Sequence, residues 1–320
     1  MKSIKFTAVL MALLLCLSGC GIMRQSGGSY NIYLIAKSSK TEFWKSVFAG
    51  ANAAKSEYNV HLTILSPETE EDFEMQNDFI RQAVEDGADA IIFSAISYTE
   101  NAAAVDEAVA AGVRVVVIDS DVDSDGVSAR IGTDNIAAGR MSAEAALDTT
   151  HEEIVVGIVN AYAETQNCRE REQGFREALQ GNGRVKGIYT VNVSTDAREA
   201  RLAAEKLLRE HPEINVLIGF NEPLAVGVAQ AVHNRGLTGR VHAVSFDSNI
   251  RCIELLQTGA ASALVVQNPY AMGYLGVEKA WQVLQGEKFD ASALIDTATT
   301  IVTKENMFTM ESQKAMFSFG

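Results

Sequence analysis

Short apolar runs of about five residues alternate along most of the chain with longer, alanine-rich amphipathic segments. The first four runs begin near Asn31, Val60, Asp89 and Arg114, and each precedes a segment long enough for a helix. Alternation of this kind is typical of βαβ units, in which helices cover both faces of a parallel sheet. We therefore predict an α/β fold with a parallel sheet in the first half of the chain.

A second set of apolar runs begins near Ile154, Val185, Asn215 and Val241. The run starts are 29, 29 and 25 residues apart in the first set, and 31, 30 and 26 residues apart in the second set. Because the two series of spacings match closely, we predict that the chain builds the same Rossmann-like lobe twice.

The N-terminal segment has a different pattern, with two lysines followed by an almost unbroken apolar run that ends in "LSGC". The run is too short to span a bilayer, so residues 1–19 are interpreted as an export signal. The ending resembles a bacterial lipobox, in which Cys20 is acylated and becomes the mature N-terminus; an ordinary signal with a chance cysteine is the alternative. Residues 20–29 would then form the lipidated N-terminus and a flexible tether. We expect the protein on the outer face of the cell membrane or in the periplasm.

The formal net charge of −14 becomes about −16 when the two signal lysines are removed. Nucleic-acid binding needs concentrated Lys and Arg, so this balance argues against it. After the signal and the lipobox are set aside, only Cys168 and Cys252 remain, and neither lies in a CxxC or zinc spacing. These two could form a disulfide, but we expect two buried thiols, and no metal or cofactor.

One short motif suggests calcium instead. The stretch "DVDSDG", 121–126, fits the first six positions of a calcium-binding loop, whose twelfth position requires a bidentate Glu. Gly132 occupies that twelfth position. A polar surface turn therefore explains the stretch better.

Candidate ligand-binding residues follow the predicted strands, because parallel open sheets bind ligands at the carboxyl ends of their strands. Asp119 and Asp247 follow the fourth run of each half, so they occupy equivalent positions. If the two carboxyl edges face each other, the cleft between them would hold Phe43, Trp44, Asp119, Arg169, Asn221, Asp247 and Gln267. Flat rings suit the C–H side of a sugar, whereas carboxylate, guanidinium and amide groups suit its hydroxyls. Lys37 is a weaker candidate near the same edge.

Each candidate also has a structural alternative. Phe43 and Trp44 begin an apolar helical stripe, so they could belong to the core. Asp119, Asp247 and Asn221 could be helix N-caps. Arg169 could be a solvated helix charge, as is expected for Arg171, and Gln267 could serve only at a crossover between lobes.

Six segments in order across the mature chain resemble the motifs of ribose/galactose-type (type I) periplasmic sugar-binding proteins. They are "AKSSKTEFWKSVFAGA", "IDSDVDS...IGTDNIAAGR", "CREREQGF", "NEPLAVG", "VSFDSN" and "LVVQNPYAMGYLGV". The resemblance implies a Venus-flytrap of two lobes. The N-terminal lobe would comprise residues 30–132 and 268–297, and the C-terminal lobe residues 133–267 and 298–320. They would be joined by crossovers near 132–135, 267–269 and 296–299. It also implies a monomer that carries a sugar or polyol to the permease of an ABC transporter.

The resemblance extends to single site residues. Phe43 and Trp44 would stack on the sugar, and the polar candidates would bind its hydroxyls. Thr41 stands where ribose binders commonly carry Asn, Glu42 replaces the usual Pro, and Ser120 stands where ribose binders carry Arg. These differences argue against ribose itself as the ligand.

Other function classes fit less well. An enzyme such as a dehydrogenase would show a glycine-rich phosphate loop after the first strand, where this chain has "KSSKTE", and no nucleophile and base set or metal spacing appears. A sugar-responsive repressor would carry a basic helix-turn-helix where the signal stands. A sensory lipoprotein that presents its bound state to a receptor or kinase remains an alternative to transport.

Overall fold

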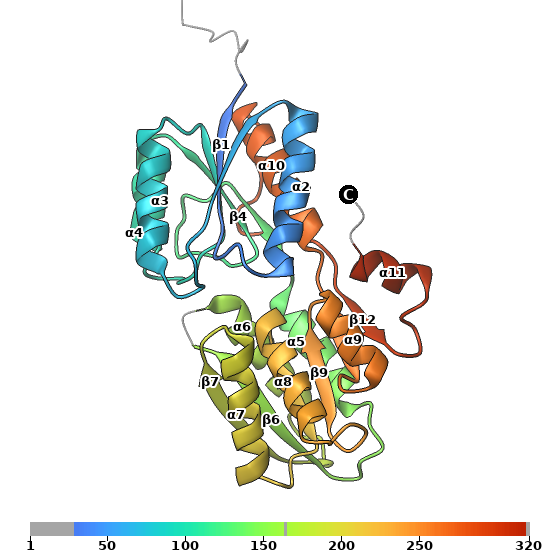
Figure 1. The fold of residues 1–320 in the computed structure, drawn as a ribbon. Helices are drawn as coiled ribbons and strands as arrows, with labels where there is room; N and C mark the ends of the chain where they lie inside the picture. Colours follow the sequence, from blue (N-terminus) through green and yellow to red (C-terminus); the bar gives the residue numbers. More distant parts are fainter. Residues whose placement is uncertain (1–28, 163–164, 318–320) are drawn as a thin grey trace, which may run out of the picture.

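The computed structural model describes residues 29–162 and 165–317 as two α/β lobes placed end to end (Figure 1). The first lobe contains a six-stranded sheet in the order β11-β5-β4-β3-β1-β2, and every neighbouring pair is parallel. Its strands are β1 (Asn31–Ile35), β2 (His61–Leu65), β3 (Ala90–Phe93), β4 (Arg114–Ile118), β5 (Ala129–Gly132) and β11 (Leu294–Asp296).

Helices cover both faces of this sheet, as Figure 1 shows. One face carries α3 (Phe73–Glu85) and α4 (Ala102–Ala110), and the other carries α2 (Glu42–Tyr58) and α10 (Pro269–Leu284). The central strands β1, β3 and β4 are buried on both sides, which explains why they read as continuous apolar runs rather than as an alternating pattern.

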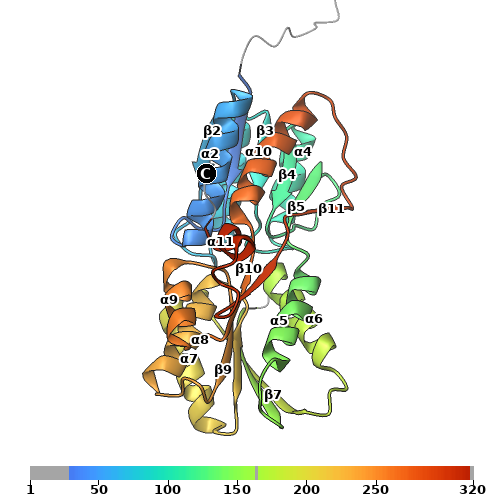
Figure 2. The same cartoon turned by 90° about the vertical axis from the view of Figure 1, so that its right-hand side faces the viewer.

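The second lobe repeats the architecture with the strand order β12-β10-β9-β8-β6-β7. Only the β10–β12 pair within its sheet is antiparallel. Figure 2 shows α5 and α6 on one side of this sheet and α7, α8 and α9 on the other. The strands are β6 (Ile154–Ala161), β7 (Val185–Val193), β8 (Val216–Gly219), β9 (His242–Phe246), β10 (Ala263–Val266) and β12 (Thr300–Thr303). The helices are α5 (Asn135–Leu147), α6 (Gln166–Leu179), α7 (Ala197–Glu210), α8 (Glu222–Asn234), α9 (Ile250–Thr258) and α11 (Met310–Met316).

The chain passes between the two sheets three times, after β5, after β10 and between β11 and β12. The crossing segments are bonded to one another: Thr133 Oγ1 donates to Gln267 Oε1 at 2.9 Å, and the Thr297 backbone N–H donates to the Gly132 carbonyl at 2.8 Å. The predicted fold class, two lobes with mostly parallel sheets joined by crossovers, is confirmed.

Close helix packing supports the first lobe. A Cβ atom added at Gly273 of α10 would lie 1.9 Å from the Val47 carbonyl oxygen of α2, and one at Gly50 would lie 2.0 Å from the Tyr270 carbonyl oxygen. The two backbones therefore touch at positions where only glycine fits. This contact fixes α2, whose first turn carries the aromatic candidates.

Three predictions from the sequence concern features away from the cleft. Cys168 and Cys252 are separate buried thiols in the part of the chain that the structure describes. Asp121, in the calcium-like stretch, forms an ion pair with Arg130, whose Nε lies 2.8 Å from Asp121 Oδ1. The signal, Cys20 and most of the tether lie outside the described residues. Among the described helices, none is both long and apolar enough to cross a bilayer.

Candidate functional site

A pocket lies between the carboxyl edges of the two sheets, and its empty space, including the part open to solvent, is about 320 Å³. Residues from both lobes line it, and they come from the loops after the strands and from the first turns of the helices that follow. The lining residues are Lys37, Thr41, Phe43, Trp44, Glu70, Asp119, Asn167, Arg171, Asn221, Glu222, Pro223, Asp247 and Gln267.

The two equivalent aspartates have the same backbone geometry. Asp119 and Asp247 each lie one residue beyond a strand end with φ values of 58° and 67°. Their backbone N–H groups donate to Ile131 and Val265, in the neighbouring strands, at 3.0 and 2.9 Å. This left-handed conformation suits Asp, whose short polar side chain bonds locally. Neither is a helix N-cap, because α9 is capped by Asn249 and the element after Asp119 is the strand β5.

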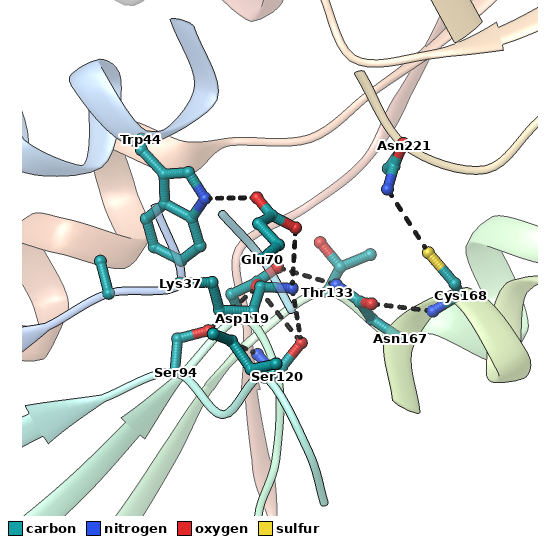
Figure 3. A network of polar contacts seen from close by, with 12 residues as sticks. Lys37, Trp44, Glu70, Ser94, Asp119, Ser120, Thr133, Asn167, Cys168 and Asn221 are labelled. Atoms are coloured by element: carbon teal, nitrogen blue, oxygen red, sulfur yellow. Dashed lines mark hydrogen bonds and ion pairs between the residues drawn. The ribbon is translucent and has the colours of Figure 1, made fainter. Parts of the chain in front are cut away.

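The surroundings of Asp119 are rich in donors (Figure 3). Lys37 Nζ lies 3.2 Å from Asp119 Oδ2, and Ser94 Oγ donates to the same oxygen at 3.1 Å. Burial raises the pKa of this carboxyl, but the charges of Lys37 and Arg171 outweigh burial and leave the pKa below its ordinary value. Asp119 is therefore held ionised before any ligand arrives.

The surroundings of Asp247 are poorer in donors. Gln267 Nε2 donates to Asp247 Oδ1 at 2.7 Å, and the charge of Arg171 favours the ionised form. Burial nevertheless dominates and raises the pKa of Asp247 to about 7. The carboxylate thus lacks the hydrogen bonds that would keep it ionised, and a ligand with hydroxyl donors would supply them.

Arg171 is almost completely buried, with 1% of its surface exposed. Its Nε donates to Asn135 Oδ1 at 2.9 Å, Nη1 to the Phe220 carbonyl at 2.8 Å and Nη2 to Gln267 Oε1 at 2.6 Å. Among the described residues these bonds use three of the five N–H donors of a guanidinium group. The remaining donors are available to a ligand in the pocket.

The lobes also contact each other directly across the pocket. Glu222 Oε2 accepts from the Phe43 backbone N–H at 2.8 Å, and its Oε1 accepts from the Glu42 backbone N–H at 3.3 Å. A carboxylate of the second lobe therefore caps the first turn of α2. Asn167 Nδ2 also donates to Asp119 Oδ1 at 3.2 Å. The structure therefore describes the lobes in contact around the pocket.

Comparison with known proteins agrees with this architecture. Residues 32–288 match the model of the periplasmic binding protein domain. The chain belongs to the periplasmic binding protein family. It is a binding protein rather than an enzyme, and membership of this family implies an extracytoplasmic location.

Curated and solved relatives extend over most of the chain. The D-ribose/D-allose-binding protein of Pseudomonas aeruginosa is 26% identical over 283 residues, which cover 85% of this chain and 88% of that protein. A carbohydrate transporter solute-binding protein of Agrobacterium radiobacter, solved with D-arabinose, has a TM-score of 0.85 and 29% identity, covering 91% of this chain and all of that one. One from Agrobacterium vitis, solved with D-fucose, has a TM-score of 0.85 and 28% identity, covering 90% and 100%.

Most candidates from the sequence line the pocket between the two lobes. The candidates that line the pocket are Thr41, Phe43, Trp44, Asp119, Asn221, Asp247 and Gln267. Some also fill the alternative role. Trp44 is 1% exposed and packs in the core of the first lobe, and Asn221 caps α8 by accepting from the Leu224 backbone N–H.

Arg169 was expected in the cleft, but it is not among the residues that line the pocket. The structure places its side chain on the exposed side of α6, and Arg171, which was expected to be solvated, lies in the pocket instead. Because α6 begins at Gln166, positions 168, 171 and 175 share its buried face, and position 169 points away. The sequence placed both arginines near the same strand end but did not show which face of the helix is turned toward the pocket.

Sequence reasoning missed three further polar groups. Glu70 comes from the loop after β2, which was left out of the search although it lies at the same carboxyl edge. Glu222 directly follows Asn221, and Asn167 lies in the first turn of α6. Lys37, the weakest candidate, is buried in the pocket wall. A search of every loop at the carboxyl edge would have found Glu70.

Proposed function

We propose that this protein is an extracytoplasmic solute-binding lipoprotein that captures a monosaccharide or similar polyol between its lobes and delivers it to an ABC permease. The observation that carries the proposal is the composition of the pocket. Aromatic side chains from the first lobe, a buried guanidinium from the second lobe and one aspartate from each lobe converge on the same space. Such groups match the C–H faces and the hydroxyls of a sugar ring.

The relatives support this ligand class, because the proteins named above were solved with, or are named for, aldoses. The two lobes would act as moving bodies, and a sugar that contacts both favours the closed form by its extra contacts.

Titration calorimetry of tail-less protein against a panel that includes D-arabinose, D-fucose, D-allose and D-ribose tests the ligand class. We expect saturable binding of at least one sugar, with a smaller radius of gyration in solution scattering at saturation. Absence of binding to the whole panel would contradict the proposal.

Arg171 and Arg169 provide a matched pair for the same assay. Arg171→Lys keeps the charge but loses the planar set of donors, so we expect binding to weaken by roughly ten- to a hundredfold. Arg169→Lys changes an exposed side chain and should leave the affinity unchanged. Equal losses for the two variants would mean that the pocket is not the sugar site.

Membrane anchoring through Cys20 is a separate part of the proposal. Cys20→Ala should move the protein from the membrane fraction to the soluble or secreted fraction while sugar affinity stays the same. Continued membrane association of this variant would exclude lipid on Cys20.

A further inference from the structure

Glu70 is a pocket residue whose bonds differ from those of the other carboxylates. Its Oε1 accepts from the Trp44 indole Nε1–H at 2.8 Å, and its Oε2 lies 3.8 Å from Lys37 Nζ (Figure 3). The side chain of Glu70 is only 12% exposed. One carboxylate therefore contacts both the ring and the ammonium group that form one end of the pocket.

Lys37 lies between two carboxylates. Its Nζ is 3.2 Å from Asp119 Oδ2 and donates to Ser120 Oγ at 3.1 Å, while Glu70 lies on its other side. Burial lowers the pKa of Lys37, but the charges of Asp119 and Glu70 outweigh burial and raise it. The ammonium group of Lys37 is thus kept charged. Lys37 follows β1, so the positive charge beside Asp119 comes from that loop and not from position 120, where ribose binders carry Arg.

The second oxygen of Glu70 still has room for a partner. Oε2 accepts no hydrogen bond from the described residues, because its distance to Lys37 exceeds that of a hydrogen bond. Because Oε2 is not among the buried side-chain atoms that lack a partner, it is open to solvent beside the pocket, and a ligand donor can take the place of water there. A hydroxyl group can donate to Glu70 Oε2 and accept from Lys37 Nζ at the same time.

This inference rests on the proposed sugar-binding function. We propose that Glu70 is a specificity-determining residue: it positions Trp44 and Lys37, and it accepts a hydrogen bond from one particular hydroxyl of the bound sugar. This role narrows the class of ligand. The protein should bind a polyol that has a hydroxyl next to the Trp44 ring more tightly than the deoxy sugar that lacks this hydroxyl. A deoxy ligand would leave Glu70 and Lys37 desolvated and unmatched, a situation that sites built for hydrogen bonding reject strongly.

Glu68 provides the matched control, because it belongs to the same loop and also pairs with a lysine. Its carboxylate lies 3.4 Å from Lys40 Nζ, and the two side chains are 90% and 61% exposed. Glu68 does not line the pocket. A substitution there tests what the loop tolerates without changing the contacts of Trp44.

The experiment measures the affinity of the best-binding sugar and each of its monodeoxy analogues by calorimetry, for wild type, Glu70→Gln, Glu70→Ala and Glu68→Ala. We expect wild type and Glu68→Ala to bind one analogue at least tenfold more weakly than the parent sugar because of Glu70. In Glu70→Ala that ratio should fall close to one at this position only, and Glu70→Gln should give an intermediate value because neutral hydrogen bonds are weaker. Unchanged ratios, or equal falls at every position, would overturn the proposal.

A second measurement needs no sugar and separates failure of this proposal from failure of the proposed function. In a Trp281→Phe background Trp44 is the remaining tryptophan. Glu70→Ala removes the indole partner, so the ligand-free emission maximum should shift, and Glu70→Gln should restore it. If no sugar binds the wild type, the proposed function fails while this shift still decides whether Glu70 positions Trp44. An unshifted maximum in Glu70→Ala would overturn that role.

Discussion

The substitution Asp247→Asn should change how the stability of the ligand-free protein depends on pH. Burial raises the pKa of Asp247 to about 7 in the folded protein, and the ordinary value for an unfolded Asp is 3.8. Between these two values the folded state binds a proton that the unfolded state has released. The free energy of unfolding of the wild type must therefore fall as pH rises through this window.

The magnitude follows from the pKa values. Each pH unit within the window costs about 1.36 kcal/mol, so raising the pH from 5 to beyond 7 should lower the wild-type stability by about 3 kcal/mol because of this residue. Asn has no proton to lose, so Asp247→Asn should lack this fall. Constant effects of the substitution, such as the weakened contact with Arg171, cancel when the two pH values are compared. Glu222 also has a raised pKa, but it is present in both proteins and contributes to the pH dependence of each.

Urea unfolding of ligand-free protein at pH 5.0 and pH 8.5, followed by circular dichroism, provides the measurement. Asp290→Asn is the control, because the pKa of this exposed Asp is lowered by its hydrogen bonds from Ser292 and its stabilising effect is lost only as pH falls below the ordinary value. Its pH dependence between 5 and 8.5 should parallel that of the wild type. If Asp247→Asn also parallels the wild type, the Asp247 carboxyl is hydrated in solution and the reasoning is refuted.

Two further predictions concern the backbone. Gly273→Ala should destabilise the protein by about 1–3 kcal/mol in urea unfolding, because the added methyl overlaps the Val47 carbonyl, whereas Gly183→Ala, with open space around it, should cause no loss; equal effects would contradict the helix contact. Ala298→Gly should raise stability by up to about 1 kcal/mol, because Ala298 has a φ of 63°. Ala110→Gly, at the end of α4, should lower it in the same assay. If Ala298→Gly lowers the free energy of unfolding as Ala110→Gly does, the backbone at Ala298, in the third crossing, is not strained.

The strands that the sequence predicted are those with an apolar run long enough to recognise. All eight predicted starts fall within one residue of a strand in the structure. The missed strands β5, β10, β11 and β12 contain three or four residues each. β11 is partly exposed and pairs only at the edge of its sheet, so its conformation depends on β5, far away in the chain. Local patterns carry no such information.

The site was predictable to the level of loops but not always to the level of single side chains. The carboxyl-edge argument located both aspartates, because strand ends determine where they lie. It failed between Arg169 and Arg171, since two positions along a helix turn a side chain by more than half a circle. It also treated pocket and core as exclusive for Trp44, whereas a large ring can pack against the core and present one edge to the pocket.

The two lobes repeat one backbone design, but their charges have diverged, and this difference bears on how closure would be driven. Asp119 is compensated by Lys37 within its own lobe. The guanidinium of Arg171 donates to the Asn135 and Gln267 side chains and to the Phe220 carbonyl, and Asp247 is left with a raised pKa. A ligand therefore gains little at Asp119 that is not already satisfied, but it supplies at Asp247 the donors that the protein lacks. We expect the affinity of the closed form to depend more on the second lobe, and the choice among sugars more on the first.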